Sequence, residues 1–168
     1  IQLTDMARFA TLLGEAERSE RIYTQLLPQL QSAGYTLLVA QVMTGQAENA
    51  AVRGDWSRSR AHAVQVRKLI PNDAWFLTSR LDLLAVADAR QRGDRPTAVA
   101  MASKLHQRAR QLGDVIVEMQ VHRLFEPGAF DKDCNAAERE ALIARTGMRG
   151  IHLDWLTPAR GKAQGAAK

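Results

Sequence analysis

The chain has few of the residues that hold disulfide-rich, β-rich or membrane-spanning proteins together. Its one cysteine, Cys134, cannot form an internal disulfide. Aromatic residues make up 5% of the sequence, whereas β-sandwiches depend on aromatic and β-branched strands. No apolar run approaches the roughly 20 residues that a transmembrane helix needs. Because alanine is abundant instead, these shortages favour an all-α fold whose helices pack closely through small side chains.

Motifs of common active sites are also absent from the sequence. It contains no GxSxG, no GxxxxGK[ST] and no GxGxxG. The four histidines, His62, His106, His122 and His152, do not stand at an HxxxH spacing, and no CxxC occurs. We interpret them as helix-surface or interface residues. The expected protein is therefore not an enzyme and has no metal site and no cofactor.

The overall composition is that of an ordinary globular domain. Of the 168 residues, 46% are hydrophobic and 24% are charged. The formal net charge of +5 permits attraction to nucleic acid or to an anionic membrane surface but specifies neither. Basic residues fall on predicted exposed helix faces and near the end of the chain, so we interpret most of them as solvated surface.

One short motif recurs at regular intervals. Residues 53–56 read RGDW, residues 92–94 repeat RGD, and residues 13–15 carry the fainter copy LGE. Their glycines, Gly14, Gly54 and Gly93, follow one another at an even interval of about 40 residues, a period typical of stacked helical repeats. Each copy lies between two apolar-periodic segments, so we interpret it as a hairpin turn and not as a cell-adhesion ligand.

Apolar residues spaced three and four apart predict a series of helices. The expected helices cover residues 3–14, 15–32, 35–53, 56–70, 74–92, the segment from the second RGD turn to 113, 115–125 and 135–146. Asp55 is placed to cap the helix that starts at 56, and Pro71 ends that helix because proline cannot continue its hydrogen-bond ladder. Gly45 lies inside a predicted helix, where it costs about 1 kcal/mol relative to alanine.

The turn and the small residues around it resemble the tetratricopeptide repeat (TPR). The features that carry this resemblance are the Gly-Asp-Trp turn, a small residue five positions after the glycine, another four positions later, and a closing proline: Ser19, Ser59, Ala63, Pro71, Ala98 and Ala102. The length of the unit, about 40 residues, is similar to that of the extended repeats in regulatory regions of bacterial transcription activators and signalling kinases.

This resemblance implies an architecture for nearly the whole chain. It implies a right-handed superhelical stack of antiparallel helix hairpins over residues 1–125, with a C-terminal cap. The units would be residues 3–34, 35–73, 74–114 and a partial 115–125, followed by a cap at 126–157 and a disordered basic tail at 158–168. Within the cap we expect 151–157 to be extended.

In such arrays the first helix of each hairpin lines a concave groove that receives a protein or peptide. Carried onto this sequence, the groove candidates are Arg8, Thr11, Gln41, Thr44, Glu48, Arg80, Leu83, Ala87 and Arg90. The lysine and asparagine set that clamps a terminal carboxylate in chaperone-binding members is absent. Arg80 and Arg90, about three turns apart on one helix, would suit an acidic segment of the partner.

The leading hypothesis is therefore a non-catalytic interaction or regulatory module, expected in the bacterial cytoplasm as a piece of a larger regulator with an attached DNA-binding or kinase domain. The sequence is also compatible with a homo-oligomer. One alternative is a domain that senses a small molecule near Met43, Trp75 and Phe76. Another is nucleic-acid binding through a basic outer face made by Arg58, Arg60, Arg67, Lys68, Lys104, Arg108 and Arg110.

Overall fold

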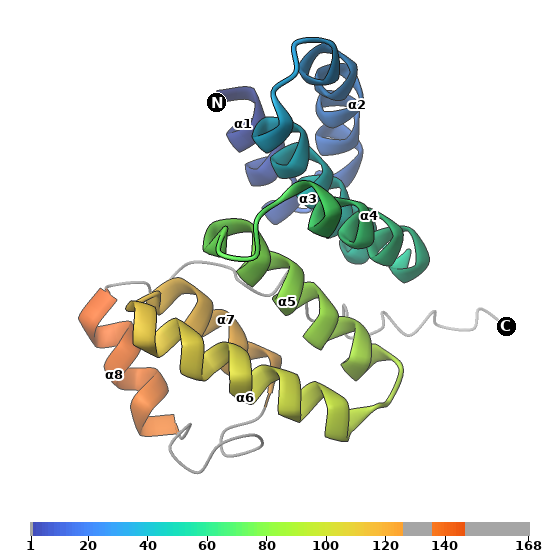
Figure 1. Cartoon of the computed structure of the whole chain (residues 1–168). Coiled ribbons are helices and arrows are strands. Elements are labelled where there is room, and N and C mark those ends of the chain that lie inside the picture. The colour runs from blue at the N-terminus through green and yellow to red at the C-terminus, as the bar shows by residue number, and fades with distance from the viewer. Residues whose placement is uncertain (1, 126–135, 147–168) are drawn as a thin grey trace, which may run out of the picture.

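Helices account for almost all of the chain that the computed structural model describes, residues 2–125 and 136–146 (Figure 1). In order they are α1 Gln2–Leu12, α2 Ala16–Ser32, α3 Thr36–Val52, α4 Trp56–Leu69, α5 Trp75–Gln91, α6 Arg95–Leu112, α7 Val115–Leu124 and α8 Ala136–Thr146. No strand occurs among these residues. The predicted all-α class is confirmed, and every predicted helix is present to within a few residues.

The two RGD turns have the same backbone geometry. Gly54 has a φ of +81° and Gly93 a φ of +75°, a left-handed conformation that glycine adopts without steric cost. The residue after each glycine caps the next helix, because the carboxylates of Asp55 and Asp94 accept the backbone N–H three residues on, at 3.0 and 3.2 Å. The predicted cap at Asp55 is confirmed, and it satisfies an N–H group of α4 that has no partner within the helix.

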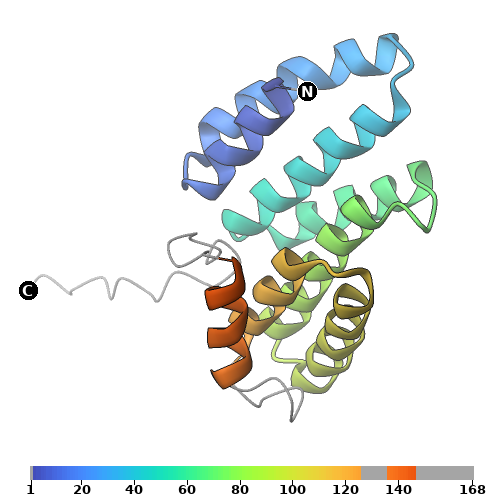
Figure 2. The ribbon, with the colours of Figure 1, turned by 90° about the vertical axis from the view of Figure 1, so that its left-hand side faces the viewer.

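The helices pack as consecutive hairpins, with α1 and α2 at one end of the molecule and α8 near the other (Figures 1 and 2). Helix α3 contacts α1, α2, α4 and α5, and α5 contacts α3, α4, α6 and α7. Nearly every residue of α3 from 39 to 51 is consequently buried. Helix α1 contacts only its partner α2 and α3 among the element pairs with substantial contact.

The main core runs through α3 to α7 and alternates small with branched side chains. Alanines at positions 47, 87, 98 and 102 are almost fully buried and let the helices approach closely. Leu77, Leu81, Val86 and Leu105 fill the spaces between them. A separate small cluster, Met119 and Leu142 with Val115 and Ile143 packed against it, joins α7 to α8.

Parts of the expected C-terminal region lie outside the described residues. Of the predicted cap at 126–157, the structure describes helix α8, which packs on α7. The expected extended segment 151–157 and the tail 158–168 belong to the part that is not described. None of the described helices is long and apolar enough to cross a membrane.

Gly45, an unfavourable residue inside a helix, is explained by the side chain that crosses it. A Cβ atom added at Gly45 would overlap the ring and hydroxyl of Tyr23 from α2. Tyr23 is 1% exposed and belongs to a cluster with Ala7 and Val42. The glycine therefore allows the second helix of the first hairpin to lie against α3.

We predict that Gly45→Ala destabilises the protein although alanine is the better helix former. Overpacking against the buried Tyr23 ring costs roughly 1–3 kcal/mol, which outweighs the gain of up to about 1 kcal/mol in helix propensity. Urea unfolding followed by circular dichroism measures the change. In a Tyr23→Leu background the same substitution should cost clearly less, and an equal cost in both backgrounds would rule out this contact as the reason for the glycine.

Candidate functional site

The nine groove candidates do not form one open surface. Six of them are buried: Thr11, Thr44, Glu48, Arg80, Leu83 and Ala87. Arg8 and Gln41 are half-buried, and Arg90 is exposed. The Arg90 guanidinium lies over the ring of Phe125, 5.9 Å from its centroid, an arrangement that attracts a cation to the ring face. The groove positions that stay accessible are therefore few and scattered over three helices.

Glu48 and Arg80 bind each other. The Nε and Nη2 atoms of Arg80 donate to the two carboxylate oxygens of Glu48, both at 2.6 Å, and the side chains are 10% and 2% exposed respectively. Burial opposes the charge on Arg80, but the nearby Glu48 carboxylate outweighs this and raises the pKa of the guanidinium. This bidentate pair joins α3 to α5 and leaves neither side chain available to an acidic partner.

Tyr23 lies beside this pair. Burial, together with the negative charge of Glu48, raises the pKa of Tyr23 to about 12 against the opposing effect of Arg80. The phenol is therefore neutral at physiological pH. A neutral phenol next to a fully paired carboxylate and guanidinium supplies no poised acid or base, so this cluster is suited to holding helices together.

Two polar residues of α3 and α5 bind the second helix of the preceding hairpin. Asn49 Nδ2 donates to the carbonyl oxygen of Ala16 at 3.0 Å and to Glu20 Oε2 at 2.9 Å, both on α2. Asp88 Oδ1 accepts from Arg60 Nη1 of α4 at 2.6 Å. Both residues stand five positions before a turn glycine, so the same position relative to the turn contacts the preceding hairpin in both cases.

In the first hairpin the corresponding position is Phe9, which stands at the same place before Gly14. Phe9 is 63% exposed, and it lies on an apolar face of α1 with Leu3 and Met6, which Leu13 extends just beyond the end of the helix; these three residues are 48–75% exposed. We call these four residues the outer face of α1. Contiguous exposed apolar side chains of this kind are characteristic of protein-binding surfaces.

Most of the predicted basic outer face is neutralised within the chain. Four of its arginines form ion pairs with carboxylates: Arg58 with Glu20, Arg60 with Asp88, Arg67 with Asp82 and Arg110 with Glu138. Arg108 lies over the indole of Trp75, 5.2 Å from the ring centroid. Few of these cations are therefore left to neutralise phosphate groups.

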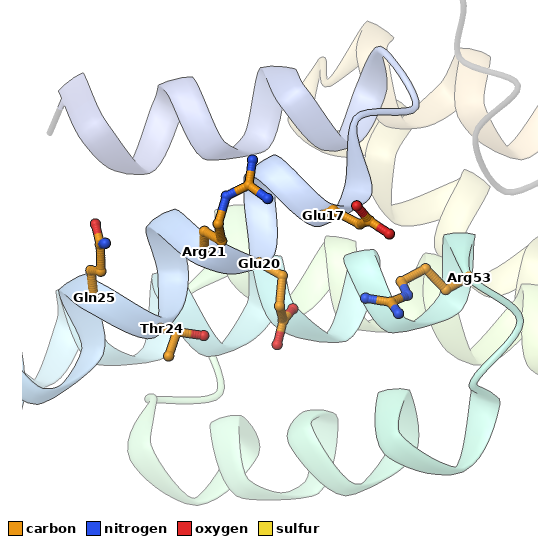
Figure 3. Close-up of a pocket in the computed structure, with 6 residues that line it drawn as sticks. All are labelled: Glu17, Glu20, Arg21, Thr24, Gln25 and Arg53. Atoms are coloured by element: carbon orange, nitrogen blue, oxygen red, sulfur yellow. The ribbon is translucent and has the colours of Figure 1, made fainter.

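The described residues enclose several hollows, of which two bear on the candidate sites. A cavity of about 260 Å³ lies between α4, α5 and α6, with Leu81, Leu84 and Met101 in its apolar wall and arginine–aspartate pairs at its edge. An open hollow of about 400 Å³ runs along α2 beside the end of α3 (Figure 3). Its lining is almost wholly polar: Glu17, Glu20, Arg21, Thr24, Gln25 and Arg53.

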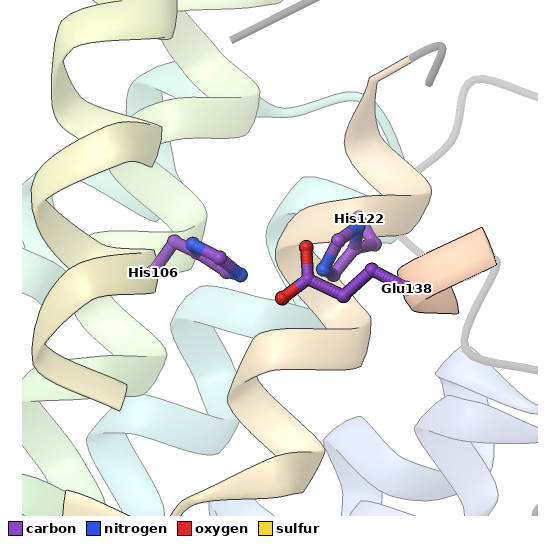
Figure 4. Close-up of side chains that lie close together, drawn as sticks. All are labelled: His106, His122 and Glu138. Carbon is purple, nitrogen blue, oxygen red and sulfur yellow. The ribbon is translucent and has the colours of Figure 1, made fainter. Parts of the chain in front are cut away.

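The structure also gathers three residues that the sequence analysis left separate. His106 of α6, His122 of α7 and Glu138 of α8 place one donor atom each within 4.8 Å of one another (Figure 4). In the sequence each of these residues stands 16 positions from the next. Because three different helices supply them, no short motif could have revealed the cluster.

Comparison with models of known protein families, with curated proteins and with solved structures finds no match to this chain. A function for this chain must therefore be inferred from the contacts, burial and charges of its described residues.

We predict that Arg80→Met destabilises the fold strongly. The substitution leaves the Glu48 carboxylate buried without its counter-ion, which costs about 3–5 kcal/mol. The double variant Glu48→Leu with Arg80→Met should lose much less, since it removes both charges. Urea midpoints measure these losses, with the exposed Arg90→Met as control at within about 0.5 kcal/mol of wild type. A single variant as stable as this control would contradict the structural role of the pair.

The raised pKa of Tyr23 predicts a loss of stability in alkali. The folded state holds the phenolic proton more tightly than the unfolded chain, whose pKa is near 10. The contribution is complete below pH 10 and disappears as the pH rises towards 12, by about 1.4 kcal/mol per pKa unit. Urea midpoints from pH 8 to 12 should fall less steeply in Tyr23→Phe than in wild type or in the exposed control Tyr35→Phe. Identical slopes in all three would be inconsistent with a buried phenol.

Proposed function

We propose that this chain is a non-catalytic helical-repeat module that binds another protein by receiving an amphipathic helix on the outer face of α1. The observation that carries the proposal is the exposure of Phe9 at the repeat position which, in the next two hairpins, contacts a preceding helix. Asn49 meets α2 there, and Asp88 meets α4. A helix from the partner would occupy the same place relative to α1.

The chemistry of this face indicates the chemistry of the partner. Where Asn49 and Asp88 bind polar groups of the preceding helix, α1 presents Phe9 between Met6 and Leu13. A helix that covers this face should therefore present apolar residues at spacings of three and four, because burying a charge against this face would leave it unpaired. The acidic partner expected from Arg80 and Arg90 has less support, since Arg80 is paired with Glu48.

The regular spacing of the turns and the shared contact position also support a tetratricopeptide-like arrangement of the hairpins. The turn glycines recur at an interval of about 40 residues, and consecutive hairpins contact each other through the same position. Helix α8, packed on α7 through Met119 and Leu142, is the element that would cap the stack. In this proposal the chain serves as the interaction part of a larger bacterial regulator in the cytoplasm.

The two alternatives have weaker support. For small-molecule sensing, the apolar cavity between α4, α5 and α6 measures about 260 Å³, somewhat below the roughly 300–1,000 Å³ of ordinary ligand pockets, and the hollow of about 400 Å³ along α2 has an almost wholly polar lining, whereas such pockets are mostly apolar. For nucleic-acid binding, the arginines of the basic face are largely paired with carboxylates. The outer face of α1 instead presents four exposed apolar side chains, and among the described helices the substantial contacts of α1 are with α2 and α3.

The proposal predicts which peptides the chain selects. A displayed library of helical peptides of the length of α2, 17 residues, should be enriched in sequences with an apolar stripe. Phe9→Glu and Met6→Glu should each weaken the enriched peptides by at least about tenfold, equivalent to about 1.4 kcal/mol. Binding is measured by fluorescence anisotropy against the full chain.

Phe76→Glu is the matched control, because Phe76 is a similarly exposed phenylalanine, 51% accessible, on α5. It should leave binding unchanged. If no peptide is enriched, or if the enriched peptides bind Phe9→Glu as tightly as wild type, the outer face of α1 is not the binding surface. If Arg90→Ala weakens peptide binding and Phe9→Glu does not, the binding site is the groove and not the outer face of α1.

A further inference from the structure

We propose that His106, His122 and Glu138 form a binding site for a divalent transition metal, best matched by zinc, that links α8 to the α6–α7 hairpin. This site is independent of the outer face of α1 and lies near the other end of the molecule. Three different helices each contribute one potential ligand, and the carboxylate of Glu138 points towards both histidine rings (Figure 4).

The two imidazole rings make a T-shaped contact at a separation that ligands of one ion can have. Their centroids are 4.9 Å apart and the ring planes are nearly perpendicular, at 86°. A zinc ion bound to two imidazoles at about 2.0–2.1 Å with a tetrahedral angle places the centroids roughly 5 Å apart. The rings therefore need little movement. The donor atoms of all three residues lie within 4.8 Å of each other. Side-chain rotations would bring them to the distance at which they coordinate one ion.

The set of donors selects the class of metal. Neutral imidazole nitrogen and carboxylate oxygen suit zinc and similar divalent ions, whereas calcium and magnesium require mostly oxygen ligands. Three protein ligands leave a fourth tetrahedral position for water or another ligand. His106 and His122 are 1% and 3% exposed, so the metal would be enclosed by protein on the side of α6 and α7.

Arg110 completes the arrangement around the carboxylate. Its Nη1 lies 3.2 Å from Glu138 Oε1. A hydrogen-bonded group behind a metal-binding carboxylate is a usual outer-shell feature, because it fixes the orientation of the ligand. The arginine side chain is half exposed, so it can keep this contact without blocking the site.

A metal at this position would strengthen a weakly held part of the fold. The apolar contact of α8 with α7 consists of a small cluster around Met119 and Leu142. A metal bound by one residue from each of α6, α7 and α8 adds a link between three helices. Since such an ion binds the folded chain and not the unfolded one, it raises thermal stability as its free concentration rises.

Titration of the metal-free full chain with zinc chloride tests the proposal. Isothermal titration calorimetry should give one site per chain, and the Tm should rise with zinc concentration. Cobalt should give the visible absorption bands of a tetrahedral ion at the same stoichiometry. Glu138→Gln keeps the size of the side chain but removes the anionic ligand, so it should weaken zinc binding by more than the roughly 10–100-fold that loss of an outer-shell partner costs.

Two control variants separate the site from neighbouring effects. Arg110→Gln removes the ion pair with Glu138 but keeps the carboxylate, and it should retain zinc binding within about 100-fold. His62→Gln changes a histidine of α4 outside the cluster and should leave the affinity unchanged. His106→Gln and His122→Gln should abolish the tetrahedral cobalt spectrum, with circular dichroism confirming that each variant folds. Absence of binding by the wild type, or equal binding by Glu138→Gln, would overturn the proposal.

Discussion

The enclosure of α3 and α5 by other helices is the constraint on which the rest of the structure depends. A polar side chain on such a helix cannot reach bulk water, so it needs a partner on a neighbouring element. Glu48 and Arg80 meet this need by binding each other at 2.6 Å. Asn49 and Asp88 meet it by binding the preceding hairpin. The same contacts that satisfy these buried groups therefore also fix how one hairpin lies on the next.

Helix α1 is less enclosed by the described helices than α3 and α5. It packs against α2 and α3, and the position that is polar and hydrogen-bonded in the next two hairpins is an exposed phenylalanine in α1. A polar residue at Phe9 would have been compatible with water, whereas an apolar one gains free energy only when another apolar surface covers it. This difference in chemistry, and not exposure by itself, separates the outer face of α1 from scattered surface residues such as Val64.

The opposite end of the molecule presents a different problem. Helix α8 adds a small apolar cluster to α7, and next to this cluster two buried histidines and a carboxylate converge. Polar groups in such a setting need either hydrogen bonds or a metal to offset their lost hydration. The two regions thus differ in kind, since one exposes apolar side chains and the other brings together two histidines and a carboxylate.

Helix positions could be predicted from the sequence because their causes are local. Apolar spacing, Asp55 as a cap and Pro71 as a stop act within a few residues, and all three agree with the structure. The groove residues and the histidine cluster could not be assigned in this way. Glu48 and Arg80 are 32 residues apart, and their burial depends on how α3 packs on α5. The sequence by itself therefore determined where each helix begins and ends, through dihedral preferences and nearby hydrogen bonds. Only the tertiary structure decided which side chains meet or stay exposed, because those contacts join residues far apart in the chain.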